Sequence, residues 1–123
     1  MTELLVGTKK GLFVLRGEPG AGFEVGARAF AGEPVEYAMR DARTGRYFAC
    51  VTSAFYGPKL FLTDDPTGEW EQAQGLELPE GAEKALIRLW TVTAGEEDGL
   101  LYAGGDPGVL FESRDGGLHW ELN

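Results

Sequence analysis

One stretch decides the fold of this chain: Ser113-Arg114-Asp115-Gly116-Gly117-Leu118-His119-Trp120-Glu121-Leu122-Asn123. Residues 109–113, which lead into it, alternate apolar and polar side chains, which is typical of a half-buried strand. The Asp115 carboxylate can accept hydrogen bonds from backbone N–H groups ahead of it, and Ser113 can add its hydroxyl. The two glycines can adopt the positive φ angles of a tight turn. Trp120 then returns a large apolar surface to the interior. The stretch predicts strand, tight turn, strand.

The spacing of Ser113, Asp115, Gly117 and Trp120 resembles the Asp-box, which is the BNR repeat of sialidases, sortilin-type receptors and related bacterial propellers. In that family the box is a structural corner between the two outer strands of a propeller blade, away from the catalytic face. The resemblance therefore implies that these four residues are structural. We expect Asp115 to cap its own turn rather than to act as a catalytic acid or a calcium ligand.

The strand–turn–strand plan occurs three times, in residues 4–25, 47–71 and 100–123. Each copy ends on an aromatic residue followed by glutamate: Phe23-Glu24, Trp70-Glu71 and Trp120-Glu121. The second copy keeps a degraded Asp-box made of Thr63, Asp65 and Trp70. A repeat of roughly 40–50 residues built from short strands is typical of propeller blades, which have four strands each.

A further strand precedes each of the last two copies, in residues 34–40 and 85–93. Residues 85–90 could also form one face of a short helix. The repeat register and the β-branched residues 91–93 favour a strand instead.

These patterns predict an all-β chain. It would be a partial β-propeller of about 2.75 four-stranded antiparallel blades, with strands in the order BCD-ABCD-ABCD. An incomplete first blade would occupy residues 1–30, a second blade 33–73 and a third 84–123, all within one domain. Because closed propellers have about 4–8 blades, we expect either self-association or the remainder of a longer propeller to complete the ring.

Composition limits the classes of partner. The chain has 123 residues and a net charge of −9, which argues against binding to nucleic acids or to anionic membranes. Cys50 is the only cysteine and lies in an apolar run, so we expect a buried thiol and no disulfide. His119 is the only histidine, and we expect no metal site and no cofactor. The absence of a signal-like segment favours a cytoplasmic protein.

The wider sequence also resembles the start of longer bacterial proteins described as sialidase-like or glycosyl-hydrolase-like. The similar stretches are residues 5–13, Arg40-Asp41 with residues 44–46, and residues 51–58. This resemblance covers nearly the whole chain, and it implies the N-terminal portion of such a propeller.

Alternating strand directions place a candidate site on the B–C loop face. The binding candidates on that face are Lys9, Lys10, Tyr56, Lys59 and Asp106, and the D–A connections add Glu33, Glu36, Tyr37, Glu83 and Lys84. A retaining sialidase needs arginines for the substrate carboxylate, a tyrosine nucleophile with a glutamate partner, and an acid. The weak candidates for these roles are Glu36, Tyr37, Tyr56 and Arg40, with Arg88 as the other arginine. A core role for Tyr37 and a solvated hairpin tip at Lys9-Lys10 are the structural alternatives.

The sequence therefore predicts a propeller scaffold of unknown activity that binds a ligand or partner, such as a small molecule or glycan, through the B–C loop face. A sialidase-like glycoside hydrolase that is active only as a complete propeller is the alternative. A pure assembly module is a third possibility. The acidic turns at Asp64-Asp65 and at residues 96–98 are expected to be solvated rather than to bind calcium.

Overall fold

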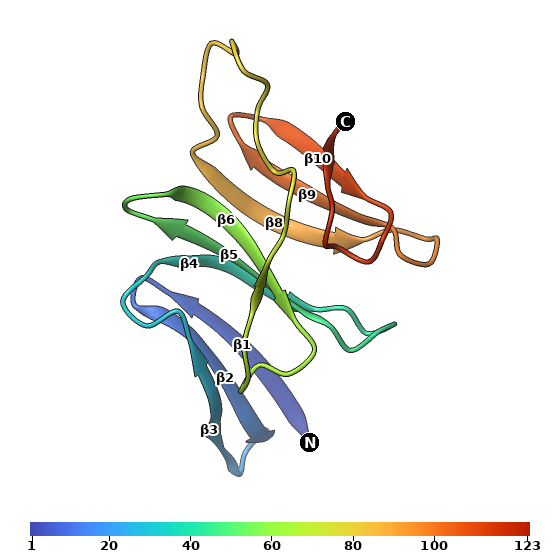
Figure 1. Cartoon of the computed structure of the whole chain (residues 1–123). Helices are drawn as coiled ribbons and strands as arrows, with labels where there is room; N and C mark the ends of the chain where they lie inside the picture. Colours follow the sequence, from blue (N-terminus) through green and yellow to red (C-terminus); the bar gives the residue numbers. More distant parts are fainter.

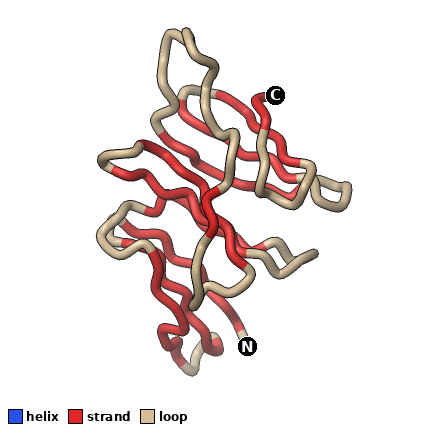
Figure 2. The backbone as a smooth tube through the Cα atoms, in the orientation of Figure 1, coloured by secondary structure: helices blue, strands red, loops and turns tan.

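The computed structural model describes all residues, 1–123, and contains strands and loops but no helix (Figure 2). The all-β prediction is confirmed. Eleven strands form three antiparallel sheets of three, four and four strands (Figure 1). Sheet 1 contains β1 (Thr2–Thr8), β2 (Gly11–Glu18) and β3 (Gly22–Ala29). Sheet 2 contains β4 (Val35–Arg40), β5 (Tyr47–Ser53), β6 (Gly57–Thr63) and β7 (Glu71–Gln72). Sheet 3 contains β8 (Arg88–Ala94), β9 (Leu101–Asp106), β10 (Val109–Ser113) and β11 (Glu121–Leu122).

The sheets follow one another in chain order, with sheet 2 between the other two (Figure 1). Within each sheet every strand pairs with its neighbours in the sequence. Short turns such as Lys9-Lys10 connect these strands, and the Thr8 hydroxyl stabilises that turn by accepting from the Lys10 N–H at 3.0 Å. The structure contains no helix that could span a membrane.

Strand β5 explains how one sheet can be covered on both faces. Its side chains alternate between two cores: Phe48 and Cys50 pack toward sheet 3, whereas Ala49 and Val51 pack toward sheet 1. All four are at most 2% exposed. This is why the sequence of β5 is a continuous apolar run rather than an alternation of apolar and polar residues.

The first strand of sheet 3 differs from its predicted bounds. The prediction of a strand from residue 85 is wrong for residues 85–87, because β8 begins at Arg88. Trp90 is the extra residue of a β-bulge, since Leu89 pairs with Gly105 and Thr91 pairs with Gly104. Leu89 is 1% exposed and Trp90 is 47% exposed, so the two side chains do not share the helical face that the pattern allowed.

The last strands of sheets 2 and 3 have two residues each. β7 begins only at Glu71. The Thr63 hydroxyl accounts for this late start, because it donates to the Glu69 carbonyl at 2.9 Å and holds that residue in the turn.

The turns lie at two ends of the sheets, which we name the loop end and the corner end. The loop end holds the β1–β2, β5–β6 and β9–β10 turns together with the connections 30–34 and 73–87. The corner end holds the remaining turns, and two contacts between sheets join them there. Arg43 donates to the Gly95 carbonyl at 3.0 Å, and Arg46 donates to the Gly116 carbonyl at 3.1 Å.

Candidate functional site

A cleft at the loop end lies where the three sheets meet, and we name it the hairpin cleft. It has a volume of about 490 Å³ and is lined by residues 7–9, residues 34–36 and Arg88. Glu36 and Arg88 form an ion pair across it, with 3.3 Å between Oε1 and Nε. The Thr52 hydroxyl donates to the same Glu36 oxygen at 3.3 Å. The cleft thus brings one carboxylate, one guanidinium and the Lys9 ammonium together.

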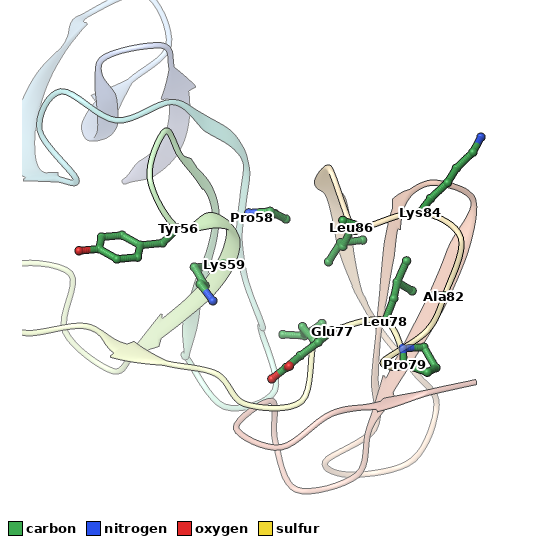
Figure 3. Close-up of a pocket in the computed structure, with 11 residues that line it drawn as sticks. Tyr56, Pro58, Lys59, Glu77, Leu78, Pro79, Ala82, Lys84 and Leu86 are labelled. Atoms are coloured by element: carbon green, nitrogen blue, oxygen red, sulfur yellow. The ribbon is translucent and has the colours of Figure 1, made fainter.

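A second cleft at the loop end lies between the start of β6 and the connection 73–87, and we name it the connection cleft (Figure 3). Its volume is about 360 Å³. Pro58, Leu78 and Leu86 give it an apolar lining, and Lys59 and Glu77 bring one positive and one negative charge to it, whereas the Lys84 side chain points away from the cleft (Figure 3). The Tyr56 ring extends away from Leu78 and Leu86 and is 78% exposed (Figure 3).

The structure separates the candidate catalytic residues from one another. Glu36 lines the hairpin cleft, whereas Tyr56 lines the connection cleft. Tyr37 packs against the core between sheets 2 and 3. Arg40 ends β4, and its guanidinium lies over the Tyr47 ring, 5.7 Å from the centroid. Glu36 therefore lies with Arg88, the other arginine that the sequence offered.

The binding candidates from the sequence all lie at the loop end. Lys9 and Lys10 form the exposed β1–β2 turn, and Lys59 lies in β6. Asp106 ends β9, where its backbone carbonyl accepts from the Ile87 N–H at 2.7 Å. Lys9 and Lys59 line clefts, whereas the role of Asp106 in the structure is to hold the start of sheet 3.

The residues of the Asp-box pattern form a closed hydrogen-bonded turn at the corner end. The Ser113 hydroxyl donates to the Asp115 carboxylate and accepts from the Gly117 N–H, both at 3.0 Å. The same carboxylate oxygen accepts from the N–H groups of Leu118 and His119 at 3.2 and 3.0 Å. The Trp120 indole donates to the Gly117 carbonyl at 2.6 Å. Every hydrogen bond that this carboxylate accepts in the structure comes from a residue of its own turn.

Gly117 is required by both space and conformation. Its φ is 105°, and a Cβ there would clash with the Phe48 ring. The glycine therefore lets sheet 3 approach β5 closely.

Sheet 2 has an equivalent turn in which the glycine is displaced. The Thr63 hydroxyl accepts from the Asp65 N–H at 3.1 Å, and the Asp65 carboxylate accepts from the Thr67 N–H at 3.0 Å. In both turns a hydroxyl and a carboxylate, from residues two positions apart, accept hydrogen bonds from backbone N–H groups.

The hydrogen bonds of the turn determine the acidity of Asp115. Partial burial by itself raises the pKa of this carboxyl, but the bonds from the His119 N–H, the His119 ring and the Ser113 hydroxyl outweigh it and lower the pKa to about 2. Asp115 is ionised under all ordinary conditions, so it can cap the turn but cannot act as a general acid near neutral pH.

The role of this carboxylate can be measured directly. We expect Asp115→Ala to lower the free energy of unfolding at neutral pH by about 1–2 kcal/mol, because the N–H groups of the turn lose their acceptor. Since the folded-state pKa lies below the unfolded value of about 3.9, the stabilisation is present above that value and is lost as the pH falls toward about 2. Denaturant unfolding of both proteins at a series of pH values gives the difference. A deficit that stays constant down to pH 2 would contradict this account.

Sequence analysis missed an arginine that joins sheets 2 and 3. Asp41 is 3% exposed and forms a two-point ion pair with Arg43, whose Nε and Nη2 lie 3.1 and 3.0 Å from its oxygens. Arg43 also donates to the carbonyls of Gly95, Glu97 and Leu100 in the turn between β8 and β9. The hydrogen bond from Arg43 lowers the pKa of Asp41 below its usual range. The sequence signal that could have predicted this ion pair is an aspartate two residues before an arginine in a turn.

Cys50 behaves as predicted. It is 1% exposed, and burial raises the pKa of its thiol to about 12. The thiol is therefore protonated and unreactive. No group of three or more His, Cys, Asp or Glu side chains is arranged to hold a metal ion. Neither a protein-family model nor a curated protein matches this chain.

Proposed function

We propose that this chain is a β-propeller scaffold that binds a ligand or partner through its loop end. On this proposal the three sheets are successive blades, an incomplete one in residues 1–30 and full ones in 33–73 and 84–123. Two features support it. The sheets follow one another in chain order, and the turns at Thr63 and Ser113 lie between the two outer strands of sheets 2 and 3, as the Asp-box does in propellers.

The positions of the lysines in the fold support the binding proposal. All four lysines of the chain, Lys9, Lys10, Lys59 and Lys84, lie at the loop end. None of them forms an ion pair, whereas five of the seven arginines do. These four ammonium groups share the loop end with the carboxylates of Glu33, Glu36, Glu83 and Asp106, so an anion would bind at a local group of cations rather than to the end as a whole. The ligand is therefore an anionic small molecule, an acidic glycan or an acidic partner surface.

The hairpin cleft is the part of the loop end best suited to a small anion. Lys9 offers a free ammonium, and the Arg88 guanidinium is 44% exposed. Glu36 already occupies one edge of that guanidinium and leaves its other N–H groups for a ligand. A carboxylated sugar would pair with Lys9 and Arg88 and hydrogen-bond through its hydroxyls to Thr8 and Glu36.

A titration with a pair of sugars tests this proposal. N-acetylneuraminic acid carries a carboxylate, and N-acetylmannosamine is a neutral counterpart. We expect the acid to shift the amide NMR signals of residues 7–10 and 34–36, and the neutral sugar to leave them unchanged. Replacing Lys9 and Lys10 together by glutamine should weaken binding about tenfold, the effect of losing one charge-assisted hydrogen bond. Equal shifts with both sugars, or shifts confined to the corner end, would sink the proposal.

The ion pair of Glu36 with Arg88 supports a second candidate function, which is a sialidase-like glycoside hydrolase active in a complete propeller. A retaining sialidase uses a tyrosine nucleophile with a glutamate partner and a separate acid. Glu36 is the one carboxylate that lines the hairpin cleft and no tyrosine lines it, which favours binding over hydrolysis. Release of a fluorophore from a sialoside by this chain, abolished by Glu36→Gln, would instead establish the hydrolase.

A further inference from the structure

The outer face of sheet 1, which points away from sheet 2, is apolar and uncovered. Strand register aligns Leu4 with Leu15 and Val25, and Val6 with Phe13. Leu4, Val6 and Val25 are 41, 37 and 46% exposed. The residues between them, such as Val14, form the core against sheet 2. A contiguous apolar face of this kind marks a surface that another protein layer covers.

The outer face of sheet 3 is also uncovered and has a different composition. Trp90 and Leu110 are 47 and 43% exposed on it. Glu112 pairs with Tyr102 on one side and with Glu121 on the other, so two carboxylates share this face with the aromatic residues. The alternate residue Phe111 is fully buried against sheet 2.

The charges of the two outer faces complement one another. The charged residue that strand register places on the outer face of sheet 1 is Arg28, which lies over the Phe13 ring, 5.7 Å from its centroid. The outer face of sheet 3 contributes Glu121 and Glu112, and Glu112 is already ion-paired with Arg114 at 3.1 Å. Packing sheet 1 on sheet 1 would oppose two arginines, whereas packing sheet 1 on sheet 3 brings the arginine to a face where Glu121 forms no ion pair and Glu112 is shared with Arg114. Like charges brought together across an interface are unfavourable.

We propose that the outer face of sheet 1 in one copy of this chain packs on the outer face of sheet 3 in a second copy. This contact continues the stacking that the chain uses between its own sheets. Because it joins two different surfaces, it closes into a ring or grows into a filament. The copy number rests on the proposed propeller arrangement: two chains supply six sheets, and six is the one multiple of three within the roughly 4–8 blades of known propellers. The closed assembly is therefore a dimer with two equal junctions.

Absolute mass from light scattering on a sizing column tests the assembly. We expect twice 13.3 kDa for the chain. Val25→Glu places a carboxylate in the face of sheet 1, and Leu110→Lys places an ammonium in the face of sheet 3. Each variant alone should elute with the mass of one chain. Both positions are more than two-fifths exposed, so circular dichroism should show the same folded spectrum as the parent. Phe55→Glu, in a turn of the loop end, is the matched control and should remain dimeric.

Mixing the two variants identifies which faces meet. A mixed dimer has one junction with both faces unaltered and one in which the introduced carboxylate faces the introduced ammonium, so an equimolar mixture should regain the dimer mass. Packing of sheet 1 on sheet 1 predicts instead that Leu110→Lys has no effect and that mixing restores nothing. That result, a single-chain mass at every concentration of the parent, or a defined mass of three or more chains would overturn the proposal. None of these outcomes alters the sugar titration at Lys9, so the two proposals fail independently.

Discussion

Replacing Trp120 by alanine lowers the free energy of unfolding by about 3–5 kcal/mol, the largest effect that we expect from one substitution. Trp120 is 3% exposed and packs in the core between sheets 2 and 3. Its backbone N–H donates to the Gln74 carbonyl at 2.8 Å, and its indole closes the turn through Gly117. Alanine leaves a cavity where the indole packed and frees the Gly117 carbonyl. Denaturant unfolding at one fixed protein concentration measures the change, since self-association would also alter stability.

Two neighbouring variants separate the contributions of the indole. Trp120→Phe keeps an aromatic ring in the core and loses the hydrogen bond to Gly117, so it should cost about 1 kcal/mol for that bond plus part of the packing. His119→Ala removes an exposed side chain from the same turn and should change stability by less than about 1 kcal/mol. If Trp120→Ala unfolded together with the parent protein, the turn would not organise sheet 3 as described.

Arg43→Ala is expected to cost about 3 kcal/mol, because it leaves Asp41 as an uncompensated buried charge. It also removes donors from the carbonyls of Gly95, Glu97 and Leu100, which lie 3.0, 2.6 and 3.0 Å from the guanidinium. Sheets 2 and 3 then lose their main polar connection at the corner end. Thermal and denaturant unfolding of the variant should both show the loss.

The charge of Asp41 provides the control for that variant. Asp41→Asn combined with Arg43→Ala removes the unpaired buried charge, so the double variant should be more stable than Arg43→Ala alone. The pH dependence has a definite sign as well. Arg43 lowers the folded-state pKa of Asp41, so this stabilisation is present above about 3.9, the unfolded value, and declines as the pH falls below it. The deficit of Arg43→Ala should therefore shrink in acid. A deficit that grows in acid would show that Asp41 is not the group involved.

Local signals in the sequence predicted the strands and the corner turn well. Asp115 and Gly117 act within a few residues of their own positions, so their roles can be read without knowing the fold. The continuous apolar run of β5 likewise predicted the buried thiol of Cys50. The bounds of β8 were harder, because the bulge at Trp90 arises from pairing with β9 and has no signature in residues 85–93 alone.

The arrangement of the candidate site was harder to predict from the sequence. The sequence placed Lys9 and Glu36 on one face by strand direction, and they do line one cleft. It grouped Tyr37 and Tyr56 with them, although the register of β4 directs Tyr37 toward the core between sheets 2 and 3. Arg43 was missed because its partners lie more than 50 residues away in the turn between β8 and β9, and only tertiary structure brings them together.

The pairing of every strand with its neighbour in the chain has a consequence for how the protein folds. Each sheet can form from one short segment, so chain closure costs little entropy before the first contacts appear. No sheet covers both of its faces alone, however, so each becomes stable by docking on the next, as in a linear array of repeats. Sheet 2 docks on both sides and is the natural nucleus. Amide hydrogens of β5 should then exchange most slowly with solvent, and opening should spread inward from sheets 1 and 3.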